Sequence, residues 1–174
     1  MSKYVSQGVS IVAEYQTKNG YKVNCAAIGN ENIFCTGDDS KCICLWSTQS
    51  RTPIKVLTGQ TSGISKVLFS PDTKYLFAGT KGGSIHVWDI EAQKNIVTLR
   101  EHKNSCSSLS VPCESLISTM TSGSQDTVIK VWDLHSGKSF FTLKGHEGTI
   151  TSTCFSPNGQ WLGSSSDNGD IKVT

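Results

Sequence analysis

The chain has 174 residues, of which 36% are hydrophobic and 17% charged, enough for one packed core with little room for a second full domain. Its 16 lysine and arginine residues against 14 aspartate and glutamate residues give a formal net charge of +2. The basic residues are scattered without a long run, which does not favour nucleic-acid binding. No segment reaches the roughly 18 apolar residues of a membrane span, and the N-terminus lacks an apolar stretch of signal-peptide length. We therefore expect a soluble intracellular protein that makes no membrane contact.

The seven cysteines are odd in number and accompany no secretory signal, so we expect reduced thiols and no disulfide framework. The alternative is a zinc site formed by Cys42 and Cys44 with Cys35 and Cys25. Structural zinc usually takes four ligands with pairs at CxxC-like spacing, which this set lacks. Free cysteine is also among the most buried residue types, so we expect no metal and no cofactor.

Three tryptophans mark a repeat. Trp46, Trp88 and Trp132 recur at steps of 42 and 44 residues, and a further step of 42 ends at Thr174. Each tryptophan closes a short alternating segment, such as Val128 to Trp132. A period of roughly 40–45 residues is typical of a repeat that forms one four-stranded blade of a β-propeller.

The repeat divides the chain into four units, at about residues 9–49, 50–91, 92–135 and 136–174. Runs rich in Val, Ile, Phe, Trp and Thr, bounded by Gly, Pro, Asp and Asn, predict four short strands in each later unit. Helical periodicity of useful length is absent.

Turns between these strands recur in the same order. Ser-Pro-Asp and Ser-Pro-Asn stand at 70–72 and 156–158, where proline sets the first corner and the Asp or Asn side chain bonds the backbone. The third unit has Ser110 to Ser115 in this place. Two extra residues there account for its longer spacing, and an insertion in a surface turn costs little.

These motifs resemble the WD-repeat family. The carriers are Trp88-Asp89, Trp132-Asp133, Gly145-His146 and the Ser-Gly-Ser-x-Asp run at 122–126. The resemblance implies an all-β fold, a WD-repeat β-propeller, whose four units form a partial, open propeller of the seven-bladed type. By the family pattern, Ser10 to Tyr15 would form an outer strand that belongs to the last blade. It also implies a hydrogen-bonded network in which a His, a strand Ser or Thr, a turn Asp and the Trp take part. The third unit has all four members: His102, Ser122, Asp126 and Trp132.

The other units depart from this network. The fourth keeps His146 and Ser164 but has Asn168 and Thr174 in the remaining places. The second has Trp88 with Gln60, Ala78 and Gly82, and the first has Trp46 with Lys18, Thr36 and Ser40. We therefore expect only the third blade to hold the complete network, and the others to depend on apolar packing and to be looser.

An enzymatic interpretation of His102, Ser122 and Asp126 would be a hydrolase triad. A nucleophile needs an exposed turn and an oxyanion hole, whereas these three positions are set by the repeat. The run Gly79 to Ser84 lacks the GxxxxGK[ST] pattern and precedes a strand, so it predicts a tight turn and no phosphate loop. We expect no catalytic residues and no enzymatic activity.

Within the WD-repeat family, the chain looks similar to the N-terminal propeller of the WD-repeat regulatory subunits of katanin, the non-ATPase partners of a microtubule-severing ATPase. The carriers are residues 83–92, 123–133 and 155–162. This resemblance implies a non-enzymatic scaffold that targets or regulates microtubule severing, with a katanin-type AAA ATPase subunit and microtubules as partners. It also implies a location in the cytoplasm and on the cytoskeleton, at microtubules, centrosome or spindle pole. In that family a separate C-terminal helical domain holds the ATPase, and this chain ends before any such region.

Two other functions stay open: a generic WD-repeat adaptor in ubiquitin ligation or signalling, and a truncated fragment without function. Four units also leave three arrangements open, because seven blades need about 290 residues at this period. They are an open arc, a strained four-blade ring, and a homodimer in which two chains share strands through their open blade edges.

Propellers bind partners through loops at one face of the ring. The family pattern places candidate contacts just before each turn Asp position, at Asp39, Lys81, Gln125 and Asp167, and three residues beyond each His position, at Tyr21, Gly63, Ser105 and Thr149. Aromatic residues are enriched at interface hot spots, which favours Tyr21. The expected ligand is a protein.

Overall fold

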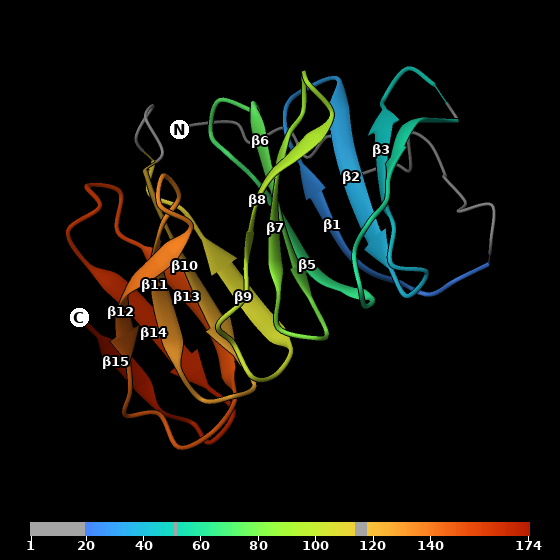
Figure 1. The fold of residues 1–174 in the computed structure, drawn as a ribbon. Helices are drawn as coiled ribbons and strands as arrows, with labels where there is room; N and C mark the ends of the chain where they lie inside the picture. Colours follow the sequence, from blue (N-terminus) through green and yellow to red (C-terminus); the bar gives the residue numbers. More distant parts are fainter. Residues whose placement is uncertain (1–19, 51, 114–117) are drawn as a thin grey trace, which may run out of the picture.

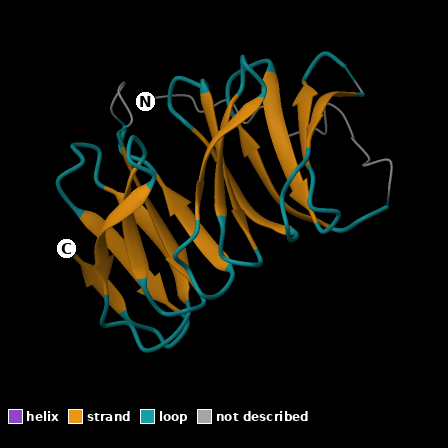
Figure 2. Cartoon of the chain, in the orientation of Figure 1, coloured by secondary structure: helices purple, strands orange, loops and turns teal. Residues whose placement is uncertain are grey.

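The computed structural model describes residues 20–50, 52–113 and 118–174, and these residues form antiparallel β-sheets joined by turns (Figures 1 and 2). The described part of the chain contains no helix, and so none that could cross a membrane. Several sequence predictions lie outside the described residues, namely the strand over 10–15, Lys18 and part of the turn that follows Pro112.

The described strands form four sheets, in which neighbours in sequence are neighbours in space. Sheet one holds β1 (Val23–Ile28), β2 (Ile33–Asp38), β3 (Ile43–Ser47) and β4 (Pro53–Leu57). Sheet two holds β5 (Ile64–Phe69), β6 (Tyr75–Thr80), β7 (Ile85–Asp89) and β8 (Lys94–Leu99). Sheet three holds β9 (Cys106–Ser110), β10 (Thr119–Ser124), β11 (Ile129–Asp133) and β12 (Lys138–Leu143). Sheet four holds β13 (Ile150–Phe155), β14 (Leu162–Ser166) and β15 (Ile171–Val173).

The sheets are offset from the sequence repeat. The outer strand β4 pairs with β3, although it follows Trp46 and belongs to the second sequence unit. Likewise β8 pairs with β7 and β12 with β11. Each of the first three sheets is therefore completed by the unit that comes next, which ties successive units together.

The hydrophobic core lies between the sheets, because strand residues alternate between the two faces of a sheet. Sheet two shows this division. Leu76 and Trp88 pack into a cluster with sheet one, while Phe77 and Val87 pack into a second cluster with sheet three. The third cluster, between sheets three and four, is smaller and contains Ile129, Ile150 and Leu162 with a few partly buried neighbours.

Glycines let neighbouring sheets approach closely. Gly37, Gly79 and Gly123 occupy the same position in β2, β6 and β10, and the first residue of the next sheet lies directly above each. A Cβ atom would come within 2.4 Å of Ile64 Cγ2 at Gly37, and within 2.3 Å of Ile150 Cγ2 at Gly123. Glycine is therefore required here by the contact between sheets.

A second set of contacts joins the sheets through polar side chains. In each sheet the register between the first two strands skips one residue of the first strand, as at a β-bulge. In sheet one this residue is Asn24, whose amide donates to the Ile64 carbonyl of sheet two at 3.0 Å. In sheet two it is Ser65, whose hydroxyl donates to the Cys106 carbonyl at 2.6 Å. The hydroxyl of Ser107 makes the same bond from sheet three to Ile150 of sheet four.

The sheets stack as an open arc. Contacts join β1 and β2 to β5, β5 and β6 to β9, and β9 and β10 to β13. Sheets one and four lie at opposite ends of the molecule (Figure 1). The predicted fold class, a partial and open propeller with four units, is confirmed.

Substitution of Gly123 by alanine tests the close approach of the sheets. We expect Gly123→Ala to lower the free energy of unfolding by about 1–3 kcal/mol, because the new methyl group overlaps Ile150. Chemical denaturation measures this change. The control is Gly163→Ala in sheet four, where the nearest atom to a new Cβ is Cys154 Sγ at 3.3 Å and the expected effect is within about 0.5 kcal/mol. Equal effects of the two variants would contradict the proposed contact.

Candidate protein-interaction face

Four of the predicted contact residues occupy one structural position. Asp39, Lys81, Gln125 and Asp167 each follow the second strand of their sheet directly, and all four are exposed. Because the sheets stack in the same orientation, these residues lie along one edge of the arc. We call this edge, with the residues that precede each first strand, the loop face.

Backbone hydrogen bonds repeat along the loop face. The N–H of Lys81 donates to the Gly63 carbonyl at 2.8 Å, that of Gln125 to Ser105 at 3.0 Å, and that of Asp167 to Thr149 at 3.0 Å. The three donors belong to the predicted contacts just before each turn Asp position. The three acceptors belong to the predicted contacts three residues beyond each His position. The structure thus brings the two sets together as pairs in sheets two, three and four.

An ion pair joins sheets one and two on this face. Lys81 Nζ lies 2.5 Å from Asp39 Oδ1, which also accepts a hydrogen bond from Asn24 Nδ2 at 2.7 Å. The hydrogen bonds from Lys81 and Asn24 hold the pKa of Asp39 below its usual range. A Cβ atom on Gly63 would lie 2.9 Å from the same Asp39 oxygen, so glycine leaves room for the pair.

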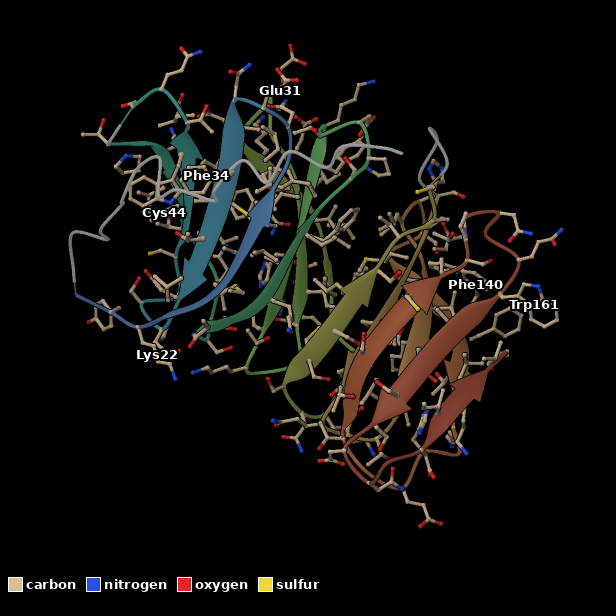
Figure 3. The ribbon with its side chains drawn as sticks, turned by 180° about the vertical axis from the view of Figure 1, so that it is seen from behind. Lys22, Glu31, Phe34, Cys44, Phe140 and Trp161 are labelled. Atoms are coloured by element: carbon tan, nitrogen blue, oxygen red, sulfur yellow. The ribbon has the colours of Figure 1, made fainter. Side chains whose placement is uncertain are left out.

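Tyr21 stands at the same edge in sheet one. One residue, Lys22, separates Tyr21 from the start of β1, and Tyr21 is 50% exposed. Figure 3 shows Lys22 at this edge of the molecule and Glu31 at the opposite edge. An exposed aromatic ring is a side chain of the type that anchors protein interfaces.

The complete hydrogen-bonded set lies in sheet three, directly behind the loop face. Trp132 Nε1 donates to Ser122 Oγ at 2.7 Å, and Ser122 Oγ lies 2.7 Å from His102 Nε2. His102 Nδ1 lies 3.0 Å from Asp126 Oδ2, which also accepts the Lys103 N–H at 2.8 Å. The chain of bonds ties the loop before β9 to the turn after β10.

The protonation states follow from burial and from the bonding pattern. Burial lowers the pKa of His102 and outweighs the opposing effect of Asp126, so the ring is neutral at pH 7. Burial opposes ionisation of Asp126, but the Lys103 N–H and His102 lower its pKa overall. A neutral ring that donates from Nδ1 and accepts at Nε2 satisfies every member of the set.

The same geometry argues against the hydrolase interpretation. Ser122 is 0% exposed, and its oxygen already accepts the Trp132 N–H. A substrate carbonyl has no access to this oxygen. His102, Ser122 and Asp126 are therefore placed for structure. In the run Gly79 to Ser84, the first two residues end β6 and residues 81–84 form a tight turn before β7.

The remaining sheets hold parts of the set. Trp46 Nε1 donates to Thr36 Oγ1 at 2.9 Å in sheet one. The expectation that this sheet depends on apolar packing alone is therefore wrong. His146 Nε2 lies 2.8 Å from Ser164 Oγ in sheet four, while Asn168 bonds Asp170 instead.

Sheet two holds buried polar groups without partners. Trp88 Nε1 and both amide atoms of Gln60 are buried and make no hydrogen bond, because Ala78 stands where the other sheets have a hydroxyl. Each such group carries a desolvation cost that no bond offsets. The expectation that sheets one, two and four are looser than sheet three stays a prediction.

Two of the four cysteines that the zinc alternative would use are strongly affected by burial. Burial raises the pKa of Cys25 to about 11 and raises that of Cys35 further. No group of three or more metal-binding side chains was found in the described ranges.

Sequence reasoning missed Asn24, which bonds both Asp39 and the next sheet. The family motifs mark turns and tryptophans, and they carry no information about the bulge position in the first strand. A polar residue recurs there as Ser65, Ser107 and Thr151, and this recurrence is the one sequence feature that could have revealed the position.

Comparison with known proteins agrees with this fold. The family model "WD domain, G-beta repeat" matches residues 51–89, 93–133 and 137–174, which is more than half of the chain. The chain therefore belongs to the WD-repeat family. It is a WD-repeat protein-interaction scaffold, and proteins of this family are generally not enzymes.

The chain matches only part of the length of each individual relative. Meiotic fizzy-related protein 1 of Schizosaccharomyces pombe is 31% identical over 112 residues, covering 64% of this chain and 25% of the relative. Nuclear distribution protein nudF of Aspergillus terreus is 32% identical over 81 residues, covering 47% and 18% respectively. A solved structure of U3-55K matches with a TM-score of 0.81 at 19% identity, over 90% of this chain and 50% of that one. The chain thus spans a quarter or less of these two relatives, and the katanin resemblance stays a prediction.

Removing the hydroxyl group at Ser122 and adding one at the equivalent Ala78 tests the hydrogen-bonded set. We expect Ser122→Ala to destabilise the chain by about 3 kcal/mol, because buried groups on Trp132 and His102 lose their partner. Conversely, Ala78→Ser supplies the missing acceptor to Trp88 and should add about 1 kcal/mol, or about 2–4 °C in melting temperature. Ala78→Val, which adds volume without an acceptor, is the control. A folded Ala78→Ser variant that melts below the parent would contradict this assignment.

The stability of the fold should decrease as the pH is lowered through the range where histidine titrates. Burial lowers the folded-state pKa of His102 and of His86 below 6.5, so the unfolded chain takes up protons first as the pH falls. Their contribution is present above about pH 6.5 and is lost below it. We expect a lower melting temperature at pH 5 than at pH 7.5, and a smaller difference in His102→Gln. His135→Gln changes an exposed residue and should behave as the parent.

Proposed function

We propose that the loop face is the partner-binding surface of this scaffold, and that the chain acts as a regulatory scaffold of the katanin type. The observation that carries the first part is the alignment of Asp39, Lys81, Gln125 and Asp167 at one exposed edge. Backbone bonds hold the last three in place, so binding them costs little ordering entropy.

The chemistry of the loop face favours a protein ligand. Asp39 and Asp167 are acidic, Lys81 is basic and Gln125 is neutral, so the face has no single sign of charge. A nucleic-acid surface would be basic throughout. Mixed charges with an exposed aromatic residue, Tyr21, suit another protein surface.

Support for the katanin type comes from the sequence runs at 83–92, 123–133 and 155–162. On this proposal the chain contributes to microtubule association and to the control of a severing AAA ATPase, in the cytoplasm at microtubules, centrosome or spindle pole. The alternative is an adaptor for a different process. The names of the relatives, one fizzy-related and one for nuclear distribution, do not point to a single process.

Co-sedimentation with taxol-stabilised microtubules tests the proposal. We expect the chain to pellet with microtubules, alone or together with a katanin-type ATPase. Tyr21→Ala and Lys81→Glu should each weaken binding about tenfold, a change of roughly 1.4 kcal/mol, since they remove an aromatic anchor and reverse a charge on the loop face.

The matched control is Lys55→Glu, which reverses an exposed charge on the outer strand β4. It should bind as the parent does. Absence of microtubule binding in both conditions would favour the adaptor. Equal losses in Lys55→Glu and Lys81→Glu would show that charge alone drives sedimentation and would remove the loop face from the proposal.

A further inference from the structure

Sheet four carries an incomplete copy of the set that sheet three completes. His146 is buried, and its Nε2 atom lies 2.8 Å from Ser164 Oγ. Its Nδ1 atom makes no hydrogen bond within the described part of the chain, whereas Nδ1 of His102 bonds the Asp126 carboxylate. A buried polar atom without a partner is unfavourable. The partner that His146 lacks is therefore a carboxylate.

The turn after β14 already has the local geometry of the turn that supplies this carboxylate in sheet three. Asn168 Oδ1 accepts the Asp170 N–H at 3.3 Å, and Asp126 Oδ1 accepts the Val128 N–H at the same distance. The two side chains differ in their second polar atom. In Asn168 this atom is the amide nitrogen, which donates to Asp170 Oδ2 at 2.9 Å. The amide thus bonds within its own turn and leaves His146 without a partner.

Asn168 is exposed, and this exposure does not come from the place of sheet four at the end of the arc. Gly82 occupies the same position in sheet two and is exposed, although sheet three packs against that sheet. His146 lies in the loop before β13, and Asn168 lies in the turn after β14. The groups of this site therefore all belong to loops that flank the first two strands of sheet four.

Asn168 is followed by Gly169, and this pair of residues is chemically reactive. Asparagine is thermolabile because the backbone nitrogen of the next residue can attack its side-chain carbonyl carbon. Glycine hinders this attack least, since it has no side chain and leaves the backbone free to rotate. The loss of the amide group converts asparagine into aspartate, which is the residue that sheet three has at this position.

We propose that Asn168 is a deamidation site, and that the aspartate formed there bonds His146 and completes the set in sheet four. The new carboxylate is repelled by Asp170, so the side chain leaves its present bond. It gains His146 Nδ1 and the N–H of Glu147, which stands at the place of the Lys103 N–H in sheet three. Hydrogen bonds to a carboxylate are stronger than those to a neutral acceptor.

The reaction has two steps and consumes one water molecule. The Gly169 N–H first leaves its bond to the Ser166 carbonyl, which is 3.1 Å long. The Gly169 nitrogen then bonds to Asn168 Cγ, the bond from Cγ to Nδ2 breaks, and ammonia leaves with the proton of the Gly169 nitrogen. Water adds to Cγ and breaks its bond to the Gly169 nitrogen. The products are an aspartate side chain and a restored Gly169 N–H.

The fold selects between the two products of ring opening. Water can also add to the backbone carbonyl of the ring, which gives isoaspartate and places an extra carbon in the main chain. Isoaspartate breaks the turn, whereas aspartate fits it, as Asp126 shows. Because both products can close the ring again, the product that the fold stabilises accumulates.

Peptide mapping by mass spectrometry tests the modification after the whole chain has been incubated in mildly alkaline buffer. We expect an acid at position 168, with aspartate in excess over isoaspartate. Incubation in denaturant should lower the ratio of aspartate to isoaspartate about fivefold, because no fold then favours either product. His146→Gln should lower this ratio in the folded chain as well.

The chain contains a matched control. Asn158-Gly159 is the same pair of residues in the turn after β13, and the Asn158 side chain bonds Ser156 and Gln160 there. The ratio of products at this pair should not depend on His146. A third pair, Asn19-Gly20, begins outside the described residues.

The variant Asn168→Asp has the side chain of the product from the start. We expect its melting temperature to rise by about 2–4 °C, because the buried Nδ1 atom of His146 gains a partner. Asn158→Asp should change it by less than about 1 °C. In the His146→Gln background, Asn168→Asp should give no rise.

Three results would overturn the proposal. They are an intact amide at position 168 in the folded chain after the incubation, isoaspartate as its main product, and equal changes in melting temperature from Asn168→Asp with and without His146. The first would show that the turn prevents ring closure. The other two would show that His146 does not receive the carboxylate.

Discussion

Burial of both faces of each sheet against its neighbours is the constraint on which this fold depends. A single sheet of short strands cannot shield its two apolar faces, so sheets two and three are stable only between neighbours. The approach is close enough that Gly37, Gly79 and Gly123 have no room for a side chain. The same stacking aligns the ends of equivalent strands, and this alignment creates the loop face.

Polar contacts add direction to this apolar stacking. Asn24, Ser65 and Ser107 each donate to the first residue of the next sheet, which fixes the offset between neighbours. Within sheets, the hydroxyl at the position of Ser122 decides whether the buried tryptophan N–H is satisfied. In sheet three the Ser122 hydroxyl accepts this N–H and bonds in turn to the neutral His102 ring, whereas Ala78 of sheet two supplies no acceptor.

The loop face offers side chains of mixed charge on a backbone that is already ordered. Its selectivity therefore lies in the identity of its residues.

The repeat, the strand positions, the turn residues and the grouping of His102, Ser122, Asp126 and Trp132 could all be predicted from the amino-acid sequence. These features are local, or they recur at a fixed period, and therefore show in one dimension. The contacts among Asn24, Asp39 and Lys81, and the bonds from Ser65 and Ser107 to the next sheet, show only in the tertiary structure. Those facts depend on how one sheet rests on the next, across about 40 residues of chain, and no spacing within a repeat encodes that contact.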